Sequence, residues 1–216
     1  MRKYNQVALP SLTRDESTGI RHYVTPEGKR YPSVTTILSS GPNKELDDWK
    51  NRIGEEEARR IASRAAHRGT YVHSMCEALL KNEQAQRNVF YDDIWLSFKP
   101  IVEKIGDVYA IETQLYSDYL EVAGTVDCVG FWNGKLSIID FKTSSRRKTT
   151  DDIHSYLMQE AAYAVCWEER TGKPITQLVT LMAVEDETPL VFVEHRDNWV
   201  KQFMSLRKSY KTAYGV

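Results

Sequence analysis

Two aspartates, Asp127 and Asp140, stand in a segment whose pattern could bring their carboxylates together. Between them lies Asn133-Gly134, the dipeptide that most strongly favours a two-residue type I′ hairpin turn. With these two residues as the loop, Asp127 comes to lie directly opposite Asp140 on the neighbouring strand. Because residues that oppose or alternate share a face, Lys142 then points to the same side as both acids.

Opposed carboxylates repel each other, because cross-strand neighbours have Cβ atoms about 4.5–5.5 Å apart. The rest of this face is apolar and calls for a covering layer of helices, which makes the charges costlier. A divalent cation between them removes the conflict, and oxygen ligands favour Mg²⁺ or Mn²⁺ over zinc. The alternative is an exposed hairpin end where Lys142 neutralises Asp140, and a one-residue bulge would break the register. The register favours the cation site.

Other residues could complete such a site. His73 and Glu77 are four apart on a predicted helix and share a face, although such a pair is often only a surface contact. The absence of a second histidine at metal spacing excludes the H-E-x-x-H zinc pattern. Gln159 and Tyr163 have the same spacing, and a solvated ridge is the alternative for them. Glu112 is a possible further acid on the preceding strand, but its facing is not fixed by the sequence.

Basic residues gather in two stretches that could contact phosphates. They are Arg146, Arg147 and Lys148 after the hairpin, and Arg59, Arg60, Arg64 and Arg68, the last three forming one helical stripe toward His73. Tyr71 could stack on bases, with core packing as the alternative. Gly69 either lets its helix approach the sheet or the substrate closely or breaks that helix.

Alternating helical and strand-like patterns define the elements that must position these residues. Strands are predicted over 108–116, 121–132, 135–142, 176–185 and 190–195, and helices over 43–82, 90–105, 151–170 and from about 197. Gly54 and Gly69 are the expected breaks in the first helix. A small hairpin is expected around Pro26-Glu27-Gly28, and Ser33 should cap a short helix. The fold class is therefore mixed α/β or α+β, with a helical N-terminal region.

Length and composition narrow the class of protein. With 216 residues, 41% of them hydrophobic, one domain with a substantial core is expected and wholesale disorder is not. It would comprise an N-terminal hairpin and helical region (1–105), a core sheet and helix (106–200) and a C-terminal helix (196–214). No apolar run reaches the length of a membrane span and the N-terminus lacks a signal-peptide pattern, so a cytoplasmic location is the default expectation. The 29 basic and 30 acidic residues argue against a large duplex-coating surface.

The pattern Asp127…Asp140-Phe141-Lys142 resembles the signature of the PD-(D/E)xK nuclease superfamily. Three further segments resemble its RecB-type exonuclease subgroup: Arg68 to His73, Ala123 to Asp127, and Gln159 to Tyr163. The run from Tyr31 to Leu38 adds a likeness to the mitochondrial genome maintenance exonucleases and their compact phage relatives, so that the resemblance covers about residues 21–200. It implies a restriction-endonuclease-like core with a mixed central sheet flanked by helices.

The resemblance also implies roles. His73, Asp127, Asp140 and the backbone carbonyl of Phe141 would hold one or two Mg²⁺ or Mn²⁺ ions, and Lys142 would orient water or stabilise the transition state. Gln159 would support the site and Tyr163 would touch nucleic acid.

The implied activity is metal-dependent hydrolysis of single-stranded DNA from a free end, which leaves 5′-phosphate products. Cys76, Cys128 and Cys166 are too few for the four-cysteine iron–sulfur cluster of some relatives, so no cluster is expected. Replication or recombination proteins are conceivable partners, and no membrane is expected. A structure-selective endonuclease and an inactive nucleic-acid-binding protein on a nuclease fold are the alternatives.

Overall fold

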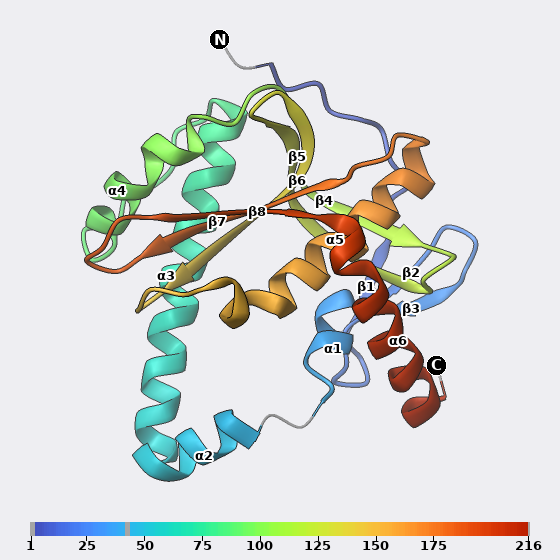
Figure 1. The fold of residues 1–216 in the computed structure, drawn as a ribbon, viewed down its shortest axis with the longest axis horizontal. Coiled ribbons are helices and arrows are strands. Elements are labelled where there is room, and N and C mark those ends of the chain that lie inside the picture. The colour runs from blue at the N-terminus through green and yellow to red at the C-terminus, as the bar shows by residue number, and fades with distance from the viewer. Residues whose placement is uncertain (1–2, 42–43, 216) are drawn as a thin grey trace.

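The computed structural model describes residues 3–41 and 44–215, without the side chains of residues 44 and 45. At its centre lies a five-stranded sheet (Figure 1). Its strands lie side by side in chain order: β4 (Val108–Ser117), β5 (Val122–Trp132), β6 (Lys135–Ser144), β7 (Gln177–Val184) and β8 (Leu190–His195). Only β6 and β7 run parallel, and the other neighbours are antiparallel. The predicted mixed α/β class is confirmed.

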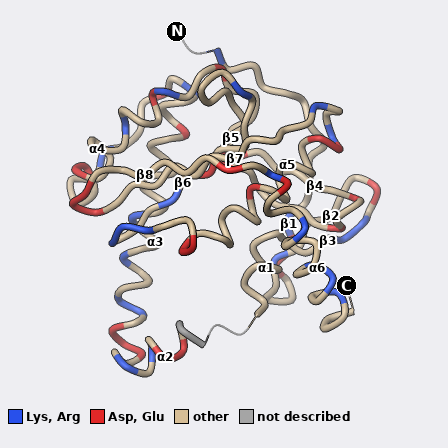
Figure 2. The backbone as a smooth tube through the Cα atoms, in the orientation of Figure 1, with Lys and Arg blue, Asp and Glu red and all other residues tan. Residues whose placement is uncertain are grey.

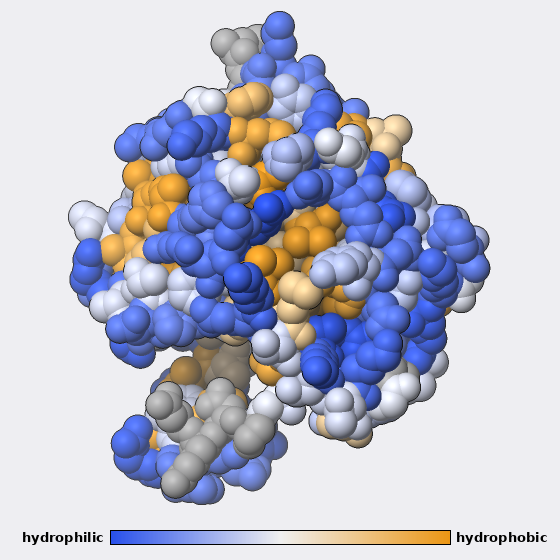
Figure 3. All heavy atoms as spheres, turned by 45° about the vertical axis from the view of Figure 1, so that its right-hand side comes forward, coloured by the Kyte–Doolittle hydropathy of each residue, from blue (hydrophilic) through white to orange (hydrophobic). Residues whose placement is uncertain are grey.

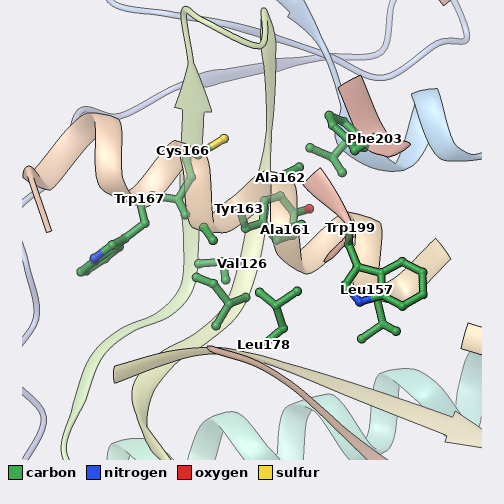
Figure 4. Close-up of a cluster of buried hydrophobic side chains, with 14 of the residues drawn as sticks. Val126, Leu157, Ala161, Ala162, Tyr163, Cys166, Trp167, Leu178, Trp199 and Phe203 are labelled. Atoms are coloured by element: carbon green, nitrogen blue, oxygen red, sulfur yellow. The ribbon is translucent and has the colours of Figure 1, made fainter. Parts of the chain in front are cut away.

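The parallel pair requires a crossover, and α5 (His154–Thr171) provides it after a 3₁₀ turn over Thr150–Ile153. On the same face of the sheet lie α1 (Val34–Leu38) and α6 (Val200–Tyr214). Figure 4 shows the apolar cluster between these helices and the sheet, with Leu157, Trp167 and Phe203 among its fully buried members. The predicted stop at Gly172 is confirmed, since α5 ends there with a φ of 69°.

The opposite face carries α3 (Glu55–Lys81) and α4 (Asp92–Val102). A second apolar cluster lies beneath them, and Phe98, Phe141 and Ile139 belong to it. Ile138 and Ile139 therefore lie in different clusters, as the alternation of side chains along a strand requires. The sheet is thus covered on both faces, which places β6 in the interior of the molecule.

The hairpin between β5 and β6 is the predicted one. Asn133 and Gly134 have φ values of 49° and 77°, as a type I′ turn demands of both central residues. Paired residues run from Trp132↔Lys135 to Cys128↔Ile139 in the expected register. The turn residues thus set which side chains of β5 meet those of β6.

The N-terminal region folds against the β4–β5 hairpin. The expected hairpin is formed by β2 (His22–Val24) and β3 (Arg30–Pro32), and the short β1 (Thr13–Asp15), which the sequence did not predict, completes a three-stranded sheet. The capping prediction is confirmed, because the Ser33 hydroxyl accepts the Thr36 backbone N–H at 2.9 Å.

The first long helical region is divided once. Gly54, with a φ of 84°, separates α2 (Lys44–Ile53) from α3, but the predicted break at Gly69 is wrong because α3 continues through it. Residue 43, where the helix was predicted to begin, lies outside the described residues. Through residues 59–67 of α3 no side chain is buried, and Ile61 is 41% exposed instead of facing a core. This half of α3, with α2 at its end, projects from the body of the protein (Figures 1 and 3).

No described helix combines the length and the apolar character that a membrane crossing needs.

Candidate active site

Asp127 and Asp140 meet where the β5–β6 ladder ends. One position beyond the last pair, Cys128↔Ile139, the Asp127 Oδ2 atom accepts the backbone N–H of Phe141 at 2.9 Å. At this point the Asp127 side chain, and not a backbone carbonyl of β5, accepts the hydrogen bond from β6. Asp127 and Asp140 are 8% and 2% exposed, so both carboxylates lie almost entirely out of water.

His73, Glu112 and Asp127 form the group with metal-ligand spacing among the described residues. One ligand atom from each lies within 4.8 Å of the other two. His73 Nδ1 is 3.8 Å from Glu112 Oε1 and 3.6 Å from Asp127 Oδ2. Two carboxylates and an imidazole converge from β4, β5 and α3, a donor set that suits a divalent cation.

Glu112 reaches this group through a local irregularity of β4. Its φ of 45° lies in the left-handed region, which is rare for a residue with a side chain and interrupts the alternation of the strand. Ala110 and Leu115, an odd number of residues apart, accordingly lie in the same core cluster. Because nothing in the residue types signals a positive φ here, the sequence left the facing of Glu112 open.

Asp140 and Lys142 form the second half of the site. Lys142 Nζ lies 2.6 Å from Asp140 Oδ2, and the Gln159 side chain contacts both residues, at 3.4 Å from Asp140 Oδ1 and 3.5 Å from Lys142 Nζ. The structure therefore brings Gln159 together with Asp140 and Lys142, and its supporting role stays a prediction. The Lys142 ammonium also lies 4.9 Å from the ring centroid of Tyr156, an aromatic contact that the sequence did not predict.

Burial and charge shift the pKa values of these groups. Burial by itself lowers the pKa of His73, but the nearby carboxylates of Glu112, Asp127 and Asp140 outweigh burial and raise it to about 9. Burial raises the pKa of Asp140, and the Lys142 ammonium opposes that shift. The same negative charge that raises the His73 pKa would attract a cation and be neutralised by it.

The cation fit can be tested on the site residues themselves. Asp140 Oδ2 is buried and, apart from its ion pair with Lys142, accepts no hydrogen bond from the residues that the structure describes. Glu112 retains a partly exposed carboxylate at the mouth of the group. Together with His73 and Asp127, this accessible Glu112 carboxylate forms a donor set that fits a divalent ion. Ligation by Asp140 and by the Phe141 carbonyl remains a prediction.

Glu160 is a buried acid that the sequence analysis missed. It is fully buried on α5, where Thr180 Oγ1 donates a hydrogen bond to its Oε1 atom. Burial, together with the charge of Asp140, raises its pKa well above the usual range. A signal was present, because Glu160 continues the apolar stripe of Ile153 and Leu157 on which a charged residue is unexpected.

Three expected nucleic-acid contacts are not exposed in this structure. Arg68 is 5% exposed and its Nη1 atom lies 2.9 Å from Glu185, so it forms a buried ion pair instead of a phosphate site. Tyr71 is 8% exposed and its hydroxyl donates to Asp92 at 2.6 Å, which corrects the expectation of an exposed stacking ring. Tyr163 is 3% exposed, so it is a packing residue beneath the site rather than a surface contact.

Gly124 explains why Tyr163 can lie there. A Cβ atom at residue 124 would stand 2.6 Å from the Tyr163 hydroxyl and 2.8 Å from its Cε1 atom, closer than atoms can approach. At Gly69 a Cβ atom would meet Thr143 Oγ1 only at 3.8 Å, an ordinary contact. Of the two glycines, only Gly124 is required by a close approach.

The remaining predicted residues surround the site at greater distance. Glu77 forms an ion pair with Lys81 at 2.6 Å instead of contacting His73. Arg64 and Arg147 pair at the surface with Glu185 and Glu187, and Arg146 pairs with Asp152. Lys148 Nζ lies 5.7 Å from the Tyr156 ring that also contacts Lys142. Figure 2 shows the basic positions spaced along α3 and in the neighbouring loop.

A mixed sheet with this carboxylate and lysine constellation defines a nuclease class. The PD-(D/E)XK nuclease superfamily matches residues 42–208, and the chain belongs to that superfamily. Divalent metal use is expected of its members, in agreement with the donor group described above.

Three curated relatives carry the name mitochondrial genome maintenance exonuclease 1. The human protein is 29% identical over 129 residues, covering 54% of this chain and 38% of its own length, and the mouse protein is 30% identical over 132 residues with the same coverage. The Xenopus tropicalis protein is 30% identical over 147 residues, covering 61% and 42%. The chain thus spans about two fifths of these relatives' length.

A solved structure described as a candidate exonuclease from Eubacterium rectale is also similar. It shares 14% identity with a TM-score of 0.48, over 67% of this chain and 64% of that one.

Proposed function

We propose that this nuclease is a metal-dependent exonuclease that hydrolyses phosphodiester bonds of single-stranded DNA from a free end. The observation that carries the proposal is the convergence of His73, Glu112 and Asp127 within 4.8 Å, from α3, β4 and β5, beside the Asp140–Lys142 pair of β6. The exonuclease names of the relatives support the mode of action, and release of 5′-phosphate products is part of the proposal.

His73, Glu112 and Asp127 would hold Mg²⁺ or Mn²⁺, with Asp140 as a further candidate ligand. Such an ion, when bound, neutralises charge on the phosphate oxygens and favours deprotonation of water. The chain's own groups orient the reaction: Phe141 fixes the Asp127 carboxylate through its backbone N–H.

Lys142 carries the positive charge that this site directs at the substrate. Asp140, Gln159 and Tyr156 contact its ammonium group and hold it in one place. Burial lowers the Lys142 pKa, but the charges of Asp140 and Asp127 outweigh burial and raise it, so the group stays protonated at neutral pH. A fixed ammonium beside the scissile phosphate can orient the attacking water or stabilise the oxygen that becomes more negative.

The projecting half of α3, together with α2, supports end dependence. These helices stand clear of the sheet beside the site, and we propose that they border a passage for one strand (Figure 1). A strand that must be threaded needs a free end.

One experiment tests activity and end dependence together. Linear and circular single-stranded DNA of the same sequence are incubated with the protein in Mg²⁺, in Mn²⁺ and in EDTA. Degradation of the linear form alone, only with metal, is expected. Equal cleavage of both forms would favour the alternative of an endonuclease.

The second alternative, an inactive nucleic-acid-binding protein, requires its own comparison. Asp140→Asn removes one charge from the buried site, and the exposed Asp151→Asn is a matched control. Hydrolysis should be lost in the first variant and kept in the second. If the wild-type chain cleaves nothing under any metal condition, the inactive protein is the correct description.

A further inference from the structure

A groove of about 970 Å³ opens next to the metal-ligand group. Glu112, with Thr113 and Gln114 of β4, lies along its inner side. The rest is lined by the N-terminal segment (Tyr4 and residues 6–11), by Lys81 and Glu83 around the end of α3, and by Ile111 and Thr125 of the neighbouring strands. The groove therefore begins at a candidate metal ligand and extends away from it, and its volume suits a ligand of more than one small fragment.

The lining is polar but carries little positive charge. Gln6, Ser11, Thr113, Gln114 and Thr125 supply neutral donors and acceptors. Among the lining residues that the structure describes, Lys81 is the cation, and it is already paired with Glu77 at 2.6 Å. Such a surface can hydrogen-bond to bases and sugars but holds phosphates weakly.

Strand order places this groove and the basic residues on opposite sides of the site. Glu112 lies on β4, Asp127 on β5 and Lys142 on β6, in neighbouring positions across the sheet. Beyond β6 lie Arg146 and Arg147 in the loop that follows it, and Arg64 beside Glu185 at the end of β7, all three with largely exposed side chains. A strand that crosses the row of acids thus has cations on the β6–β7 side and the groove on the β4 side.

We propose that the groove is the product subsite, which receives the nucleotides cut from the end of a strand while the basic side holds the remaining polymer. This inference rests on the proposed exonuclease function. Many phosphates of the polymer favour the cationic side, since each neutralised phosphate adds affinity. A short fragment must leave after each cut, and a subsite with few cations lets it dissociate. The size of the groove then limits the length of the released fragment.

Filling the groove tests this inference. Gln6 and Ala8 are exposed and line it, whereas the neighbouring exposed Asn5 does not. Gln6→Trp and Ala8→Trp therefore narrow the subsite, and Asn5→Trp is the matched control. Product lengths are read from an internally labelled single-stranded oligonucleotide, and hydrolysis of bis(p-nitrophenyl) phosphate, which has no nucleotides to place in the groove, reports on the site itself.

Both groove variants should shift the products toward mononucleotides and dinucleotides, with the small ester cleaved at the wild-type rate. Asn5→Trp should give the wild-type length distribution. Unchanged product lengths in active Gln6→Trp and Ala8→Trp proteins would overturn the subsite. Failure of the wild-type chain to cleave either substrate would instead overturn the exonuclease function on which it rests.

Discussion

The Asp127 carboxylate accepts the backbone N–H of Phe141 at 2.9 Å, directly beyond the last paired residues of the β5–β6 hairpin. This contact fixes one carboxylate oxygen of the candidate metal site to the strand that carries Asp140 and Lys142. The two strands therefore position their acids jointly, and the metal-ligand group depends on an intact end of the hairpin.

Replacement of Asp127 by asparagine should separate the effect of its charge on catalysis from the effect of its hydrogen bond on stability. The amide oxygen can still accept the Phe141 N–H, so the melting temperature should change little. Loss of the negative charge should lower kcat by roughly 10²-fold or more, as for other removed electrostatic groups in active sites. Kinetics and thermal unfolding of Asp127→Asn are compared with those of Asp151→Asn, whose side chain is 97% exposed. An active Asp127→Asn protein would contradict the assignment.

Tyr156 should matter for catalysis through its ring and not through its hydroxyl. Its ring lies 4.9 Å from the Lys142 ammonium and 5.7 Å from that of Lys148. A cation–π contact contributes about 0.5–2 kcal/mol, so Tyr156→Leu should lower kcat by roughly 2- to 30-fold. Tyr156→Phe keeps the ring and should remain close to wild type. Equal losses of kcat in both variants would contradict this role.

Gly124 and Gly69 should respond oppositely to the same substitution. Gly124→Ala forces a Cβ atom against Tyr163 and should destabilise the protein by about 1–3 kcal/mol. In Gly69→Ala the new Cβ atom meets Thr143 Oγ1 at an ordinary 3.8 Å, and the change should stabilise the protein by about 0.5–1 kcal/mol because glycine is unfavourable inside a helix. Urea unfolding measures both.

The partner of Gly124 provides the control. In the double variant Gly124→Ala/Tyr163→Ala the added methyl group no longer meets a ring, so the two losses of stability should not add. Additive losses would show that Tyr163 is not the residue that excludes a side chain at position 124.

Metal binding should release a proton at neutral pH. The pKa of His73 is raised from 6.5 to about 9, so the metal-free protein holds this proton at pH 7, whereas a metal ligand must be neutral. Affinity should therefore increase as pH rises from 7 to 9. Titration calorimetry in two buffers of different ionisation enthalpy counts the proton, and His73→Gln should release fewer. The same proton count in both proteins would contradict the assignment.

Local sequence features predicted one part of the site well. Asn133-Gly134 determines the turn, and through it which residues of β5 and β6 face each other, because strand side chains alternate strictly. The Ser33 cap and the stop at Gly172 were predictable for the same reason, since a few neighbouring residues decide them.

Features that depend on distant contacts were not predictable. Burial of Arg68 requires Glu185, and burial of Tyr71 requires Asp92 in α4. The positive φ of Glu112 is stabilised by its surroundings and has no residue signature. The three-residue strand β1 is too short for a periodic pattern and forms only because β2 lies beside it. The sequence therefore predicted that Asp127 and Asp140 approach each other on the hairpin, but not how Glu112 of β4 is oriented.

The Arg68–Glu185 ion pair has a mechanical consequence for α3. The helix is 27 residues long, or about 40 Å, and its buried stretch begins at Arg68. The pair ties the helix to the end of β7 between the exposed half and His73. The pair is an anchor: the exposed outer half of α3 buries no side chain between residues 59 and 67, whereas the half that bears His73 is held against the sheet. Bending of the exposed half would therefore leave the candidate metal ligands in place.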